Sequence, residues 1–156
     1  MNRITRIACV AFAFAAVAAC TQSPDPAKVQ AGIAKAQADG EKKIADANAD
    51  MQKVMADVHK DAADTRADAT ANANNPNASM PADASVTAPT ANKKIADAQY
   101  NVDKASAEAQ YNTALARCEG VTGDANKSCK DSAKTKYDAD ETAAKNKHDA
   151  VKSGGA

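Results

Sequence analysis

The sequence predicts an all-α protein made of a long Ala-rich helix, a disordered linker and a disulfide-stapled antiparallel helical hairpin, with no large globular core. Of the 156 residues, 41 are Ala, which favours helix because its side chain loses no entropy on ordering. Val, Ile, Leu and Phe together supply only 17 residues, too few for an ordinary core. All five Pro residues lie before residue 27 or between residues 76 and 89, so the remaining segments can form uninterrupted helices.

Residues 1–19 have the layout of a signal peptide. Arg3 and Arg6 precede an uncharged apolar run over residues 7–19, which ends at Cys20. A run of this length reaches about 20 Å as a helix, short of the roughly 30 Å hydrocarbon core of a bilayer. A lasting transmembrane span is therefore disfavoured, and we expect residues 1–19 to be removed.

Residues 17–20, Val-Ala-Ala-Cys, resemble the lipobox of bacterial lipoproteins. The resemblance implies that Cys20 becomes the first residue of the mature chain and carries a diacylglycerol thioether, with a further acyl chain on the new amino group. Because each buried CH₂ contributes about 0.8 kcal/mol, several chains attach a protein permanently to a membrane. Thr21 stands where enteric-type sorting reads Asp as inner-membrane retention, which favours the periplasmic face of the outer membrane. The alternative is an ordinary signal peptide with Cys20 as a spare thiol.

The mature chain would open with a short tether over residues 20–26, followed by a helix over residues 27–73. Pro26 suits the first turn of that helix, and no further Pro interrupts it. Small and apolar residues recur along it with spacings of 4, 3 and 4, an eleven-residue period that gives a nearly straight seam. They are Val29, Ile33, Ala36, Gly40, Ile44, Ala47, Met51, Met55, Val58 and Ala62. So narrow a stripe buries little surface, and we expect the helix to fray unless association or a surface supports it.

Residues 74–91 are rich in Asn, Ser and Pro, which indicates a disordered linker. The helical pattern restarts at Asn92 and predicts a hairpin over residues 92–152, with a flexible tail over residues 153–156. Tyr100 and Tyr111 repeat the eleven-residue spacing within this hairpin. Between its two helices, Gly120 suits a left-handed cap and Asp124 suits an N-cap.

Cys118 and Cys129 would meet at the closed end of this hairpin. In an oxidising periplasm, with Cys20 consumed by lipid, these two thiols remain to form a disulfide. The bridge would stabilise the hairpin by about 3 kcal/mol. Beneath it we expect a small core of Tyr111, Leu115, Ala133 and Tyr137. Redox exchange and metal ligation are weaker alternatives, because redox cysteines normally lie two residues apart and structural zinc needs two further ligands.

We identify no catalytic, cofactor or metal site in the sequence and do not expect an enzyme. Lys plus Arg and Asp plus Glu number 20 each, so there is no basic field for nucleic acid. Opposite charges stand at helical spacing, for example Asp39 with Lys43, which indicates a solvated face. His59 and His148 have no partners at metal-ligand spacing, and we interpret each as a solvent-facing helix residue.

The hairpin also resembles a group of small, uncharacterised Ala/Lys-rich envelope lipoproteins of proteobacteria. The motifs that carry this resemblance are Tyr111-x-x-Ala114-x-x-x-Cys118, Gly123-x-Ala125-x-x-x-Cys129 and Ala133-Lys134. It implies a location in the cell envelope without an activity. A lipidated Cys before an Ala-rich helix is similar to the murein lipoprotein, which is joined to peptidoglycan through a C-terminal Lys; here Lys152 is followed by residues 153–156. The eleven-residue Ala/Lys/Asp repeat is similar to late-embryogenesis-abundant protectants.

These observations predict a lipid-anchored periplasmic helical spacer, or interaction lipoprotein, that carries the hairpin into the periplasm. Its partners would be the membrane, through the anchor, and another envelope protein or peptidoglycan. The narrow stripe of the first helix would also serve a homo-oligomer. The alternative function is a stress or desiccation protectant whose helices fold on demand. The sequence leaves open the partner, the oligomeric state and whether the first helix packs on the hairpin.

Overall fold

The structure is a computed structural model that describes residues 24–73 and 84–154. It contains α1 (Pro26–Ala73), α2 (Ala84–Cys118) and α3 (Gly123–Lys152), and no strand occurs in these ranges. The predicted all-α class is confirmed. The predicted signal peptide, the lipobox with Cys20, most of the tether, residues 74–83 of the predicted linker and the last two residues lie outside the described residues.

Helix α1 begins where the sequence predicts. Pro26 is its first residue, a position where the missing N–H costs nothing. The Ala27 backbone N–H donates to Asp25 Oδ1 at 3.0 Å, so Asp25 caps the helix. The helix then runs for 48 residues, which corresponds to a length of about 72 Å.

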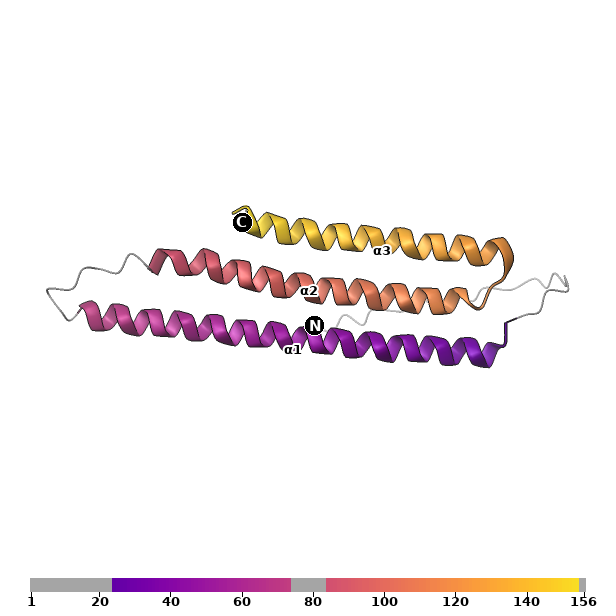
Figure 1. The fold of residues 1–156 in the computed structure, drawn as a ribbon, viewed down its shortest axis with the longest axis horizontal. Helices are drawn as coiled ribbons and strands as arrows, with labels where there is room; N and C mark the ends of the chain where they lie inside the picture. The colour runs from indigo at the N-terminus through magenta and orange to yellow at the C-terminus, as the bar shows by residue number, and fades with distance from the viewer. Residues whose placement is uncertain (1–23, 74–83, 155–156) are drawn as a thin grey trace, which may run out of the picture.

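The helices lie side by side in one layer with α2 in the middle, antiparallel to both neighbours (Figure 1). Within the described residues, α1 contacts α2, α2 contacts α3, and α1 and α3 do not meet. The sequence of α2 explains this arrangement, because it carries two rows of small buried residues at eleven-residue intervals. One row is Ala96, Ala107 and Cys118, and the other is Ala98 and Ala109. Two residues along a helix correspond to about 200° of rotation, so the rows lie on nearly opposite sides.

The prediction of a disordered linker over residues 74–91 was wrong for residues 84–91, because α2 already begins at Ala84. Pro89 is one of the residues whose type favours an extended chain. It lies in the second turn of α2, where its missing N–H removes a single intrahelical hydrogen bond. Extending a helix that is already held by its neighbours costs far less than starting a new one, and Ala-rich sequence favours the extension.

The stripe predicted along α1 faces α2 only in part. Its positions from Val29 to Met51 are buried or half-buried, as expected of a packed face. Beyond them the stripe is kept only in part, because Val58 is half-buried whereas Met55 is 39% exposed and Ala62 is also exposed. Val54 and Thr65, which lie outside the predicted stripe, are half-buried. Helix α1 is therefore supported by α2 rather than isolated.

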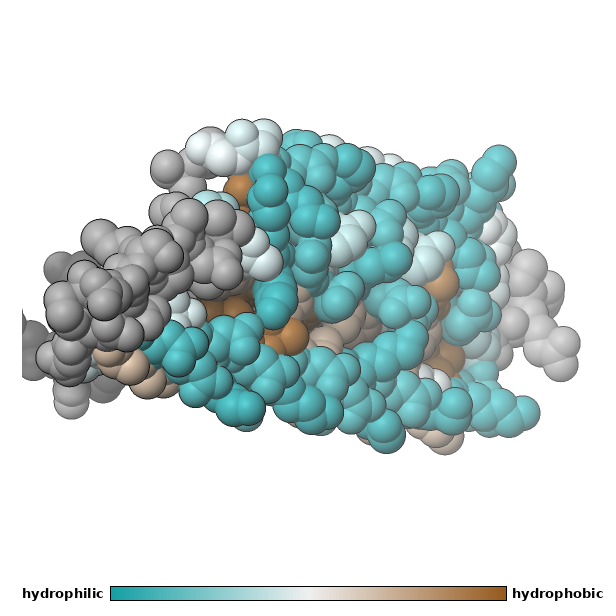
Figure 2. Space-filling view, turned by 60° about the vertical axis from the view of Figure 1, so that its left-hand side comes forward, coloured by the Kyte–Doolittle hydropathy of each residue, from teal (hydrophilic) through white to brown (hydrophobic). Residues whose placement is uncertain are grey.

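The core is thin, in agreement with the predicted absence of a large globular core. Among the side chains that the structure describes, the buried apolar residues are Ala96, Ala98, Ala107, Ala109, Cys118 and Ala144, and of these Cys118 is fully buried. Figure 2 shows hydrophilic residues over most of the coloured surface, with most of the apolar residues in this view lying between the lower helix α1 and the helices above it. Alanine packs this layer because its small side chain lets helix backbones approach closely, at the expense of buried area.

The turn between α2 and α3 differs from the prediction in both of its special positions. The glycine with a left-handed backbone is Gly123, with φ of +61°, and not Gly120. The N-cap of α3 is Thr122, two residues before the predicted Asp124, and its side chain makes no capping hydrogen bond. The turn is therefore shorter than predicted, and α3 begins two residues earlier.

Candidate functional site

The closed end of the hairpin is held by a disulfide and by polar contacts around it. Cys118 and Cys129 are bonded, with their Cα atoms 5.7 Å apart, which confirms the predicted pairing. The Asn126 side chain donates from Nδ2 to the carbonyl oxygens of Cys118 at 2.6 Å and Val121 at 3.1 Å. The Cys118 carbonyl, at the end of α2, also accepts the Val121 N–H at 3.2 Å, and the Val121 carbonyl lies in the turn that follows. Asn126 therefore ties the end of α2 and the turn to the first helical turn of α3. Sequence reasoning missed Asn126, since its acceptors become visible only when the turn is formed.

The core predicted beneath the disulfide is formed around one aromatic pair. The rings of Tyr111 and Tyr137 lie 5.0 Å apart between centroids, tilted by 32°. Leu115 and Ala133 are half-buried, as are both tyrosines, so these four residues flank the seam rather than fill a sealed interior. A hydrogen bond to Glu141 raises the pKa of Tyr137, so its hydroxyl stays protonated at neutral pH.

A second aromatic contact lies further along the same seam. Tyr100 and His148 have ring centroids 5.1 Å apart. Tyr100 is eleven positions before Tyr111, and His148 is eleven positions after Tyr137. The two ring contacts are therefore about three helical turns apart on both helices, and we call them the aromatic rungs. The interpretation of His148 as solvent-facing was wrong, because its side chain is only 16% exposed. His59 is exposed, as predicted.

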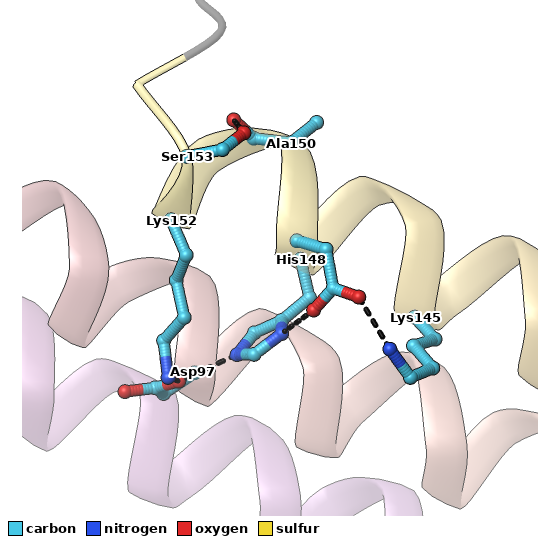
Figure 3. A network of polar contacts seen from close by, with 7 residues as sticks. Asp97, Lys145, His148, Ala150, Lys152 and Ser153 are labelled. Atoms are coloured by element: carbon cyan, nitrogen blue, oxygen red, sulfur yellow. Dashed lines mark hydrogen bonds and ion pairs between the residues drawn. The ribbon is translucent and has the colours of Figure 1, made fainter.

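His148 belongs to a cluster of charged groups that joins the end of α3 to α2 (Figure 3). Its Nε2 atom lies 2.6 Å from Asp97 Oδ1 and its Nδ1 atom lies 3.0 Å from Asp149 Oδ1. Lys152 Nζ lies 2.8 Å from the same Asp97 oxygen, and Lys145 pairs with Asp149. The imidazole therefore stands between two carboxylates, each of which also contacts a lysine.

The contacts within the cluster change the pKa values of His148, Asp97 and Asp149. The hydrogen bonds to Asp97 and then Asp149 raise the pKa of His148 above its ordinary value of 6.5. Lys152 and then His148 lower the pKa of Asp97, and Lys145 and then His148 lower the pKa of Asp149. Protonation of His148 therefore strengthens the link between α2 and α3.

A crevice of about 340 Å³ lies next to this cluster, between α2 and α3. Its apolar walls are Ile95, Ala96, Tyr100, Ala144 and Val151. At its edge Lys147 pairs with Asp103 at 3.4 Å, so charges of both signs meet there. Among the residues that the structure describes, no group of three or more His, Cys, Asp or Glu is arranged to hold a metal ion. The cluster links α3 to α2 through the contacts of His148 and Lys152 with Asp97.

The contact between α1 and α2 was left open by the sequence and is an extended seam. A Cβ atom at Gly40 would lie 2.6 Å from Ala109 Cβ, so the backbones meet at a glycine. Lys43 pairs with Glu108 at 3.0 Å, and Asp61 pairs with Lys94 at 3.3 Å. Lys43 therefore does not form the helical pair with Asp39 that its spacing suggested; Asp39 pairs with Lys35 instead.

The closed end of the hairpin lies beside the start of α1. A Cβ atom at Gly120 would lie 3.5 Å from Val29 Cγ1, which places the turn against the first helical turn of α1. The sequence left the packing of the first helix on the hairpin open; in the structure α2 runs back along α1, so the hairpin turn and the beginning of α1 lie together. In the part of the chain that the structure describes, no helix is both long and apolar enough to cross a membrane.

Comparisons with known proteins add no family. No family model matches the chain, and neither the curated proteins nor the solved structures contain a significant match.

Proposed function

We propose that the chain is a lipid-anchored helical spacer of the cell envelope, attached through Cys20 to the periplasmic face of the outer membrane. The observation that carries this proposal is the position of Cys20, which follows Val-Ala-Ala and an apolar run and precedes the first residue of α1 by six positions. A helix of 48 residues placed directly after an anchor extends about 72 Å. Its partner would be another envelope protein or peptidoglycan.

The packed layer supports a spacer over a protectant with helices that fold on demand. Helix α1 rests on α2 through Gly40 and two interhelical ion pairs, and a disulfide joins α2 to α3. A preformed structure of this kind should give cooperative unfolding by circular dichroism in dilute buffer. Helix content that appears only on drying or with lipid vesicles would favour the protectant instead.

The anchor is tested by replacing Cys20 with Ser and comparing cell fractions and intact masses. We expect the native protein in the membrane fraction with the mass of residues 20–156 plus acyl chains, and the variant without them. Cys9→Ser is the matched control, because Cys9 lies in the segment that we expect to be removed and its loss should leave the mature mass unchanged. A native protein with an unmodified thiol at Cys20 would overturn the proposal.

A further inference from the structure

We infer that the disulfide-closed end of the α2–α3 hairpin rests against the lipid headgroups beside the anchor. The opposite end of the layer, where α1 ends and α2 begins, is then the end presented to a partner. This inference rests on the proposed lipidation of Cys20. It assigns the lipid surface as the neighbour of one end of the molecule, which the spacer function alone does not specify.

The first step is that the start of α1 and the closed end of the hairpin are the same end of the molecule. Val29, in the first turn of α1, approaches Gly120 in the turn between α2 and α3. Figure 1 shows the beginning of α1 and the turn between α2 and α3 at one end of the layer, opposite the end of α1 and the start of α2. Whatever holds the beginning of α1 therefore also holds the hairpin turn.

The second step is the length of chain between the anchor and the helix. Pro26 lies six positions after Cys20, and even a fully extended chain of this length spans only about 20 Å. The far end of α1 lies about 72 Å from its beginning. The closed end thus stays close to the bilayer in every orientation, whereas the far end is free to stand away from it.

The third step is that the layer has no face on which to lie flat in a membrane. Helices that lie in the interface bury a continuous apolar face among the headgroups. Among the side chains that the structure describes, Met55 is the only large hydrophobic one that is exposed. The outward faces instead carry ion pairs such as Lys42–Asp46 and Lys134–Asp138, which would lose their hydration. Contact through the end of the layer leaves the ion pairs along the outward faces of the helices in water.

The surface of the closed end is compatible with headgroups but does not bind them by itself. Thr122 and Gly123 are exposed there, and Lys130 is paired with Glu119 at 2.8 Å. Nearby Lys127 and Asp124 are exposed charges of opposite sign. Because the end has neither a basic excess nor an apolar wedge, the anchor must supply its attachment.

The end of the layer that lies at the bilayer can be identified by the quenching of a fluorescent label by nitroxide-labelled lipid headgroups. A fluorescent amino acid is introduced in place of Thr122, whose side chain makes no capping hydrogen bond. The matched label replaces Ala69, an exposed residue near the end of α1. Each full-length protein is isolated from membranes, its acyl chains are confirmed by mass, and it is added to zwitterionic phospholipid vesicles that contain a nitroxide-headgroup lipid.

We expect several-fold stronger quenching at position 122 than at position 69, with position 69 at the level of the unlipidated Cys20→Ser protein. Equal quenching at both positions would mean that the layer lies flat, and quenching only at position 69 would mean that it is inverted. Background quenching at both positions would mean that the closed end stands off the membrane. Each of these results overturns the orientation while the acyl mass upholds the anchor, whereas absent acyl chains overturn both.

Discussion

Helix α2 is held on its two sides in different ways. Toward α1 the seam is built from the smallest residues, with Gly40 against Ala109, and no covalent bond crosses it. Toward α3 the seam has two aromatic rungs and the Cys118–Cys129 disulfide. A chain poor in large aliphatic residues can thus join helices either by close approach of their backbones or by a few aromatic contacts and a disulfide. The first kind of seam depends on the size of each side chain along it, and the second depends on the disulfide and the two ring pairs.

Removing the cross-link should have the largest effect on this contrast. Cys118→Ser combined with Cys129→Ser should lower the free energy of unfolding by about 3 kcal/mol, because the unfolded chain loses its closed loop. Urea unfolding followed by circular dichroism measures the change. Wild-type protein in reductant should unfold like the double variant, and an unchanged midpoint in both would show that the aromatic rungs suffice.

Adding one methyl group to the α1–α2 seam should have the next largest effect. A Cβ at Gly40 would meet Ala109 Cβ at 2.6 Å and its Cα at 3.2 Å, so Gly40→Ala should destabilise by about 1–3 kcal/mol. At Gly32 nothing lies within 4 Å, and Gly32→Ala should stabilise α1 by up to about 1 kcal/mol. Thermal unfolding of both variants measures this difference in sign.

A compensating change sharpens that comparison. Ala109→Gly in the Gly40→Ala background makes room for the added methyl group and should restore part of the lost stability. If Gly40→Ala and Gly32→Ala shift the melting temperature in the same direction, the close approach of α1 and α2 does not hold in solution.

A smaller effect is expected from the aromatic rung nearest the disulfide. Tyr111 and Tyr137 should be coupled by about 0.5–1.5 kcal/mol, the range for tilted ring pairs. A double-mutant cycle with Tyr111→Leu and Tyr137→Leu isolates this coupling from the loss of buried area. Additive single effects would mean that each ring contributes only by burial.

The smallest effect should be a pH dependence from His148. Its pKa is raised on folding by Asp97 and Asp149, so its contribution to stability is complete below its unfolded value of 6.5 and disappears as pH rises through the folded value. The pKa values of both aspartates are lowered, so their contribution is present above 3.8 and is lost in acid. The advantage of wild type over His148→Gln should therefore be larger at about pH 5.5 than at about pH 8.5. Melting curves at the two pH values measure it, and an equal or reversed difference would contradict the assignment.

The elements set by short-range relations could be predicted from the sequence. The helical segments follow from Ala content, and the disulfide and the Tyr111–Tyr137 pair follow from spacings within one hairpin. The docking of α1 could not be predicted, because Ala lines several faces of each helix and the pattern does not distinguish the buried row. Gly40 within the stripe was the available signal, and its meaning depends on the register against Ala109.

The parts of the site that were missed depend on residues far apart in the chain. His148 meets Asp97, 51 positions earlier, and no local spacing relates them. The predicted start of α2 is too late because Pro89 locally favours the end of a helix. In the structure the helix continues through Pro89, because the rest of α2 is held by neighbouring helices. Cys20 lies outside the described residues, so its lipidation stays a prediction.

The even interval between the aromatic rungs makes this molecule adjustable in length. Eleven residues correspond to about three helical turns and 16.5 Å, so duplicating or deleting one such block in both α2 and α3 would leave the same sides of these two helices facing each other. A matching block in α1 would keep its seam with α2 in register, where Gly40 meets Ala109 and Lys43 pairs with Glu108. The reach of such a layer can thereby change in whole increments of about three turns.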